Sequence, residues 1–431
     1  MLRYLLIFLT GVVTSFFYFP TTLAILPSTV NTKMVLAVIG LFVILFQSVG
    51  RRSFNIQKDV LWLSIVAGVV SIIGFIAVIY NNTQDYAYAT YIVSMWVWLS
   101  AAYVVVSLIK YIHGDIDVKI LCKYIIGVCV FQCIIAQAID ANPIICDFAK
   151  RLMGDDKEWI ESVNRLYGIG AELDTAGIRF SIALVMTAFL SMRCTNAKDQ
   201  LVYIIAFLII AVLGSMIART TYVGCVIGFT YLIIASGIWR FKMKTSMSKM
   251  LGVLISLLII IIPVCVYLYN TDLRFYTLLR FAFEGFFNLF ENGEWSLASN
   301  EKLKSMIVFP ETLKTWIIGD GYFANPYNSD PYYVGEYIEG WYMGTDIGYL
   351  RFIFYFGLLG LSAFVFFITY AARLCWRTYL GYKPMIILIY LVGLVVWAKV
   401  STDIFLVFAL FICLSLISVK NSKEDSSVSC K

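Results

Sequence analysis

The chain has 431 residues, of which 61% are hydrophobic and 14% are charged, and its formal net charge at pH 7 is +6. This composition excludes a soluble fold, and we attribute the positive excess to membrane topology rather than to nucleic-acid binding. Apolar stretches of roughly 16 to 25 residues, the length that crosses a bilayer as a helix, recur from end to end. The sequence therefore predicts an all-α integral membrane protein.

About twelve such stretches are predicted to be transmembrane helices. In chain order they are Tyr4–Leu26, Val30–Val49, Val60–Tyr80, Tyr86–Ile109, Ile120–Ile139, Ala176–Met192, Leu201–Ile217, Tyr222–Ile238, Met250–Tyr269, Ile347–Tyr370, Met385–Ala398 and Ile404–Val419. The first is not expected to be a cleaved signal peptide, because its apolar run is too long and no small-x-small site follows.

Lysine and arginine orient these spans, because they collect in alternate connections. The clusters are Arg51-Arg52-Lys58, Lys110-Lys119-Lys123, Arg193-Lys198, Arg240-Lys242-Lys244-Lys249, Arg373-Arg377-Lys383 and, after the last span, Lys420 and Lys423. Basic residues near a membrane mark the cytoplasmic side. Both termini are therefore expected to be cytoplasmic.

Two outer segments are long. We expect a bundle of nine spans over residues 1–269 with an outer loop at 140–175, a large outer loop over 270–345, three further spans over 346–420, and a cytoplasmic tail over 421–431. In the large loop, Leu273–Phe290 predicts an amphipathic helix at the headgroup level. Asn300–Val308 and Glu311–Ile318 predict short helices.

The last part of the large loop, Gly319–Gly344, is rich in Gly, Tyr, Asn and Asp. Aromatic faces stack on sugar rings, and amides and carboxylates bind sugar hydroxyls, so this composition suits a carbohydrate ligand. The alternative is an ordinary structured loop whose tyrosines anchor at the membrane interface.

Histidine and cysteine offer no metal site. The one histidine, His113, is expected on the cytoplasmic side, and the ten cysteines show no CxxC or Cys/His spacing. Neither a zinc site nor a disulfide framework is predicted. A carboxylate must then supply any general base on the outer face.

Charged residues gather at the outer ends of spans, while the span interiors hold no Asp, Glu or Lys. The outer groups are Glu172, Asp174 and Arg179 in GIGAELDTAGIRFSI, Arg219 in SMIARTTYVG, and Asp346 and Arg351 in GTDIGYLRFIFYFGLLG. Arginines near a membrane usually lie on the cytoplasmic side, so arginines on the outer side need an explanation. The guanidinium group presents several N–H donors that fit a phosphate, and phosphate binding would explain them. Snorkelling or a salt bridge is the alternative for each one. Asp346 and Tyr349, three residues apart, are expected to share a helix face.

Three stretches carry a resemblance to a known family. They are TAGIRFS, the short outer turn ARTTYVG, and the run WIIGDGYF…GTDIGYLRF…GLLG. Together they resemble the Wzy-type O-antigen or polysaccharide polymerases, within the group that includes the O-antigen ligases. Ligases typically have His-Asn where this chain has Thr345-Asp346, which favours a polymerase.

The resemblance implies a glycosyltransferase of lipopolysaccharide or related polysaccharide biosynthesis in the bacterial inner membrane, with its large loop in the periplasm. Donor and acceptor would both be glycans on undecaprenyl pyrophosphate, and the lipid pyrophosphate would leave. Neither a metal nor another cofactor is implied, nor is nucleic acid. Membrane lipids and a chain-length regulator protein are the other expected partners.

On this basis roles can be assigned to individual residues. Arg219, Arg179 and Arg351 are expected to bind the pyrophosphate, with Arg219 stabilising charge in the transition state. Asp346 is expected to orient the acceptor or accept its proton; the alternative is that it only caps the tenth span. The remaining expected substrate-binding residues are Glu172, Tyr349, Arg274 and Arg280, the last two admitting the lipid headgroup.

Three rival functions remain open. A lipid-linked oligosaccharide flippase or other transporter would line a central cavity with polar or charged groups, which these spans lack. An O-antigen ligase would carry the outer histidine. A membrane scaffold without enzymatic activity would leave the outer arginines unexplained.

Overall fold

The structure is a computed structural model of the chain. It describes residues 2–50, 57–153, 165–237, 245–327, 330–331, 333–335 and 340–428. Several residues named above lie outside these ranges: Arg51, Arg52, Arg240, Lys242, Lys244, the middle of the outer loop at 140–175, and parts of Gly319–Gly344.

Over the described ranges the chain is helical, as predicted. Its only β-pairings there are two isolated bridges, Thr22–Asn31 and Ala324–Trp341. Six of the described helices are long and apolar enough to cross a membrane. They are α3 (Lys58–Asn81), α4 (Tyr91–His113), α5 (Val118–Ala141), α8 (Leu173–Ser191), α9 (Ala197–Ile217) and α16 (Gly348–Thr378).

The other predicted spans also coincide with helices, although several are shorter. These are α1 (Leu2–Tyr18), α2 (Thr32–Gly50), α10 (Thr221–Ser236), α11 (Thr245–Thr271), α17 (Lys383–Val396) and α18 (Phe405–Val428). The chain bends by 119° between α11 and α12 (Leu273–Ala282). The large loop also contains α13 (Glu284–Asn292), α14 (Ala298–Ser305) and α15 (Leu313–Ile317).

The amphipathic helix predicted over Leu273–Phe290 is wrong as a single element. It is two helices, α12 and α13, that break at Phe283, whose φ of −106° and ψ of 24° lie outside the helical region. The apolar pattern continues through the break, so it gave no sign of the corner.

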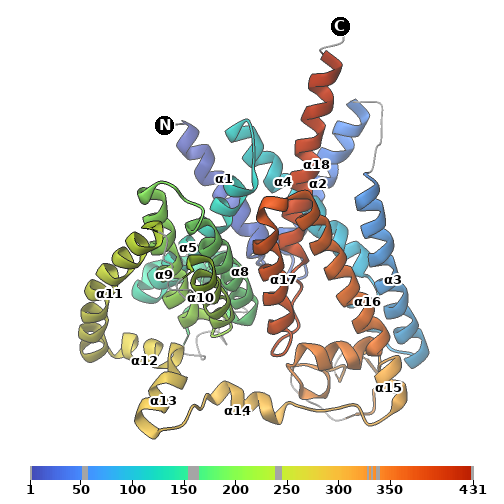
Figure 1. The fold of residues 1–431 in the computed structure, drawn as a ribbon. Coiled ribbons are helices and arrows are strands. Elements are labelled where there is room, and N and C mark those ends of the chain that lie inside the picture. Colours follow the sequence, from blue (N-terminus) through green and yellow to red (C-terminus); the bar gives the residue numbers. More distant parts are fainter. Residues whose placement is uncertain are drawn as a thin grey trace. The chain divides into compact units, whose positions relative to one another are not determined.

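The helices pack into two compact units, which cut across the expected linear segmentation. The first unit comprises residues 1–32 and 112–297, and the second comprises 33–111 and 298–431. In the first unit α8 lies among α5, drawn in teal in Figure 1, and α9 and α10, drawn like α8 in green. Close contact is possible because Gly224 of α10 meets the backbone of Ser181, where a Cβ would come within 2.2 Å of its Cα.

An aromatic cluster forms the centre of the second unit. The rings of Phe364 and Trp397 stack at 5.3 Å, and Phe367 contacts Phe405 at 5.0 Å. These side chains join α16 to α17 and α18 and are fully buried. Their burial supplies the apolar core of this unit.

Helix α16 is broken near its N-terminal end. Phe356 and Gly357 are non-helical, and Gly357 has a φ of 69° that favours glycine. The break deprives the preceding carbonyls of their helical partners, and the loop before α16 replaces them. The amide of Asp320 donates to the Phe354 carbonyl at 2.6 Å, and that of Gly321 donates to the Tyr355 carbonyl at 3.0 Å. Irregular backbone in a membrane protein requires such internal partners.

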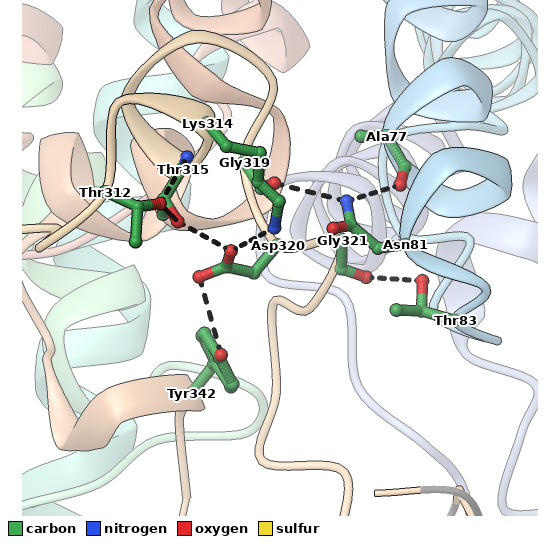
Figure 2. A network of polar contacts seen from close by, with 10 residues as sticks. All are labelled: Ala77, Asn81, Thr83, Thr312, Lys314, Thr315, Gly319, Asp320, Gly321 and Tyr342. Carbon is green, nitrogen blue, oxygen red and sulfur yellow. Dashed lines mark hydrogen bonds and ion pairs between the residues drawn. The ribbon is translucent and has the colours of Figure 1, made fainter.

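The Gly-Asp-Gly sequence at 319–321 docks the large loop onto this break and onto α3, as Figure 2 shows. Asn81 donates to the Gly319 carbonyl at 3.1 Å, and Thr83 donates to the Gly321 carbonyl at 2.9 Å. Gly319 has a φ of 85°, and a Cβ there would lie 2.5 Å from the Tyr355 backbone. Glycine is therefore required at this position by backbone conformation and by space.

Asp320 fixes the same loop through its side chain. Its Oδ1 accepts from Lys314 at 2.7 Å and from Thr315 at 2.8 Å, and its Oδ2 accepts from Tyr342 at 3.4 Å (Figure 2). The motif thus has a structural role that the family resemblance alone did not reveal.

Candidate functional site

The residues singled out from the sequence fall in both units. Glu172, Arg179, Arg219, Arg274 and Arg280 belong to the first unit, and Asp346, Tyr349 and Arg351 belong to the second. Each group is described within its own unit.

The turn that carries Arg219 is packed tightly on α8. Ser181 donates from its hydroxyl to the Thr220 carbonyl at 3.0 Å and accepts from the amide of Gly224 at 3.0 Å. Gly177 faces the same turn, where a Cβ would lie 2.7 Å from that of Thr220. The small and hydroxylated residues of TAGIRFS and ARTTYVG therefore form one interface that sets the position of Arg219.

Arg219 is held by a protein carboxylate and a carbonyl. Its Nη1 lies 2.6 Å from Oε2 of Glu284, and its Nε donates to the Phe281 carbonyl at 3.0 Å. The guanidinium also lies over the Phe281 ring, 4.1 Å from its centroid. Burial lowers the pKa of Arg219, Glu284 opposes that effect, and the neighbouring Arg165 adds to it.

Arg165, which sequence reasoning missed, lies over the same ring. Its Cζ is 4.7 Å from the Phe281 centroid, and its buried Nε has no hydrogen-bond partner. Burial lowers the pKa of Arg165, and the charge of Asp174 opposes it. Asp174 in turn accepts a hydrogen bond from the Thr220 hydroxyl. We call Arg165, Asp174, Arg219, Phe281 and Glu284 the Arg219 group.

Arg179 lies in the second turn of α8. Its Cζ is 5.6 Å from the Phe19 centroid, and its Nε is buried without a hydrogen-bond partner. Glu172 occupies the N-cap position of α8 without bonding the helix amides through its side chain, and its charge acts on Arg179. Each of the three arginines therefore has a carboxylate acting on it: Asp174 on Arg165, Glu284 on Arg219 and Glu172 on Arg179.

Arg274 and Arg280 are both engaged by protein carboxylates. Arg274 donates to Oδ1 of Asp140 from Nε at 2.9 Å and from Nη2 at 2.7 Å. Arg280 bonds both oxygens of Glu291, at 2.7 and 2.6 Å. These ion pairs join α12 to α5 and to α13. They give Arg274 and Arg280 a role in holding these helices together. Their expected role at the lipid headgroup remains a prediction.

Arg351 lies between two aromatic rings in the second unit. Its Cζ is 3.4 Å from the centroid of Trp341 and 3.8 Å from that of Phe323. The residue is 3% exposed, and its buried Nε and Nη2 have no hydrogen-bond partner. A buried charge with unused donors costs stability, and such groups are normally paired or bind a ligand. We call Arg351, Phe323 and Trp341 the Arg351 clamp.

Backbone pairing brings the two rings of the clamp together. Ala324 and Trp341 form an isolated bridge, and the amide of Asn325 donates to the Gly340 carbonyl at 3.0 Å. The amide of Phe323 donates to Oδ2 of Asp85 at 2.7 Å. The clamp is thereby built into the large loop where that loop meets α16.

Asp346 precedes α16 and acts electrostatically on Arg351, as does Asp85. The prediction that Asp346 shares a helix face with Tyr349 is wrong, because the helix begins at Gly348. The alternative that Asp346 is the N-cap is also wrong, because Ile347 holds that position. In the first turn of α16, the amide of Tyr349 donates a hydrogen bond to the Trp397 carbonyl at 3.1 Å.

Tyr349 has a packing role. Its hydroxyl donates to the Leu394 carbonyl at 2.7 Å, and its ring contacts Trp397 at 5.9 Å. Both contacts tie α16 to the end of α17, so the hydroxyl of this expected substrate-binding residue already has a protein acceptor.

Asp403 is a partly buried carboxylate in the second unit to which the sequence assigned no role. Its Oδ2 accepts from Tyr91 at 3.1 Å, and its Oδ1 accepts from the Phe405 amide at 2.8 Å. Burial raises the pKa of Asp403, and these two bonds lower it in part. The bonds identify Asp403 as a structural residue at the start of α18.

Neither a metal site nor a similar known protein points to the function of this chain. Across the ranges that the structure describes, no three His, Cys, Asp or Glu side chains are grouped to hold a metal ion. Comparison of the chain with protein-family models, curated proteins and solved structures gave no match. The assignment of function therefore depends on the site geometry and the sequence motifs.

Proposed function

We propose that this chain is a polymerase that joins undecaprenyl-pyrophosphate-linked oligosaccharide repeat units into O-antigen or a related surface polysaccharide. Arg351 is the observation that supports this most directly. Its guanidinium is held in place by two rings, yet it retains unused buried donors. A preorganised donor fork of this kind suits a diphosphate, whose oxygens it can bind in a bidentate manner.

In the proposed reaction, a hydroxyl oxygen of the acceptor sugar attacks the anomeric carbon of the donor glycan. The bond from that carbon to the diphosphate oxygen breaks, and the lipid diphosphate leaves with the electron pair. Arg351 stabilises the growing negative charge. Asp346 accepts the proton from the attacking hydroxyl.

The proposed topology places twelve spans in the bacterial inner membrane, both termini in the cytoplasm, and the large loop in the periplasm. The alternating basic clusters support it. Val334, which is 100% exposed in this loop, provides a labelling site. A Val334→Cys variant should react with a membrane-impermeant thiol reagent added from the periplasmic side more than wild type does. Reaction only from the cytoplasmic side would contradict the topology.

The activity is tested with purified protein and purified lipid-linked repeat units, by resolving the products on a gel. We expect a ladder of longer lipid-linked glycans, which persists with a chelator present. Transfer of glycan only to a lipid A core acceptor would instead identify an O-antigen ligase. Movement of intact lipid-linked glycan across vesicles without elongation would identify a flippase.

The proton-acceptor role is tested by comparing two carboxylates. Asp346→Asn should lower elongation about 10²- to 10⁴-fold, because the amide cannot accept the proton. Asp403→Asn is the matched comparison, since that residue is bonded at the start of α18 and is expected to affect folding more than rate. Near-normal elongation by a well-expressed Asp346→Asn protein would remove Asp346 from the mechanism.

A further inference from the structure

A groove runs between α5 and α9 in the first unit. Its volume is about 450 Å³, within the range of small-molecule sites. The α5 wall consists of Lys123, Ile126, Gly127 and Val130, and the α9 wall consists of Asp199, Val202, Tyr203, Ile205, Ala206 and Ile209. Apart from one lysine and one aspartate at its mouth, the lining is almost wholly apolar.

The groove is open to the outside of the helix pair. Val202 on one wall is 62% exposed, and Gly127 on the other is exposed, with no atom within 4 Å of the position a Cβ would take. Glycine inside a helix costs stability relative to larger residues. No neighbouring helix packs against Gly127, so close packing does not require a glycine there. The missing side chain leaves the groove open at this point.

The groove is as long as one leaflet. From Asp199 to Ile209 the helix rises about 15 Å, roughly half of a hydrocarbon core of about 30 Å. It starts at the N-terminal ends of both helices, where the charged residues are. A ligand with a polar head at that end and an acyl chain along the helices would match this distribution.

The mouth of the groove is predominantly basic. Lys119 and Lys123 of α5 and Asp199 of α9 all act electrostatically on Cys194, which places them in one neighbourhood. Lys198 adjoins Asp199 in the sequence. Asp117 is engaged as the N-cap of α5, where it accepts from the Ile120 amide at 2.7 Å. Basic pockets between membrane helices bind anionic lipid headgroups.

From these features we infer that the groove between α5 and α9 binds an anionic phospholipid with a hydroxyl-bearing headgroup, of the phosphatidylglycerol type. The phosphate lies at Lys123 and Lys119, the headgroup hydroxyls donate to Asp199, and an acyl chain fills the apolar channel past Gly127. On the proposed topology this is the cytoplasmic leaflet. The site is therefore separate from the outer-face chemistry of the proposed function, and it stands or falls independently of that proposal.

The test uses full-length purified protein in detergent and phosphatidylglycerol that carries a photoreactive group in one acyl chain. After irradiation, labelled peptides are identified by mass spectrometry. We expect the label to concentrate on peptides of α5 and α9, and unlabelled phosphatidylglycerol to compete better than phosphatidylcholine. Uniform labelling of lipid-facing helices, or equal competition by the two lipids, would show annular lipid only and overturn the inference.

Two pairs of variants sharpen the result. Gly127→Leu fills the groove and should reduce α5 and α9 labelling to background, whereas Gly252→Leu, at an equally open glycine on α11, should not. Lys123→Gln should weaken phosphatidylglycerol binding about fivefold at low salt, as expected for one basic side chain near a headgroup, and Lys58→Gln should not. Unchanged labelling in Gly127→Leu would contradict the site. Stronger competition by a polyprenyl phosphate than by phosphatidylglycerol would assign the groove to the substrate tail instead.

Discussion

The Arg219 group and the Arg351 clamp present the same side chain in two different environments. Arg219 is neutralised by Glu284 at 2.6 Å and bonded to a carbonyl. Arg351 contacts two aromatic faces, is 3% exposed, and keeps two buried nitrogen atoms without hydrogen-bond partners. In the first arrangement a carboxylate pairs with the guanidinium, whereas in the second two donor nitrogens stay unused.

This difference separates stability from function. Removing an arginine that has a carboxylate partner leaves that carboxylate half-buried and uncompensated, which destabilises the fold. Removing an arginine with unsatisfied donors relieves a desolvation cost. Residues kept in a costly environment are often those that act on a ligand, so the two arginines should respond to mutation in opposite ways.

The largest expected effect is on the reaction rate at the clamp. Arg351→Met, which keeps the length and apolar stem of the side chain, should reduce polymer formation about 10²- to 10³-fold through loss of a charge-stabilising donor. Arg351→Lys should restore little of it, because the bidentate fork is lost. Arg373→Met, at an exposed arginine on the same helix, is the control and should retain activity.

The next effect is on stability and distinguishes the two groups. Arg219→Met should lower the free energy of unfolding by about 1–3 kcal/mol, since Glu284 loses its partner. Arg351→Met should leave the melting temperature in detergent unchanged or raise it. The double variant Arg219→Met with Glu284→Gln should recover part of the loss. A lower stability for Arg351→Met than for Arg219→Met would contradict the proposed difference between the Arg351 clamp and the Arg219 group.

A smaller effect is expected from the rings of the clamp. Trp341→Leu should lower activity about 2- to 30-fold, which corresponds to the ~0.5–2 kcal/mol of one cation–π contact. Trp341→Phe should retain most of the activity. Trp295→Leu serves as the control, since that ring contacts Phe286 in the first unit at 4.9 Å. Equal losses from Trp295→Leu and Trp341→Leu would point to general damage rather than to the clamp.

The smallest effect is expected at Arg280. Its bond to Glu291 is bidentate, but both partners are substantially exposed, and solvent screens such pairs. Arg280→Gln should therefore leave the melting temperature within error, and elongation should fall only if the guanidinium also contacts the lipid headgroup. Loss of elongation with an unchanged melting temperature would show that Arg280 binds substrate in addition to pairing with Glu291.

Apolar length was enough to predict the helices, because a membrane requires long runs of apolar residues. It could not predict where α16 is interrupted, since Phe356-Gly357 lies inside an unbroken apolar stretch and the break depends on amides from residues 320 and 321. The motifs singled out Arg219 and Arg351, whose roles at the substrate stay predictions. Their environments depend on distant residues, such as Glu284 for the first and Trp341 and Phe323 for the second.

Arg165 illustrates a different limit. It belongs to no motif, and it becomes notable only because it lies over the same Phe281 ring as Arg219, at 4.7 and 4.1 Å. The distinction between Arg219, which has a carboxylate partner, and Arg351, which has none in hydrogen-bond contact with Nε or Nη2, is likewise invisible to hydropathy and motif patterns.

Diphosphate binding to the clamp can be measured directly by isothermal titration of the purified full-length protein with geranyl diphosphate, a soluble polyprenyl diphosphate. Wild type and Arg373→Gln should bind alike, and Arg351→Gln should bind at least tenfold more weakly while its melting temperature is maintained, as expected for loss of a charge-assisted bond worth ~1.5–3 kcal/mol. Equal affinity in all three proteins would show that Arg351 is not a diphosphate ligand and would contradict the account.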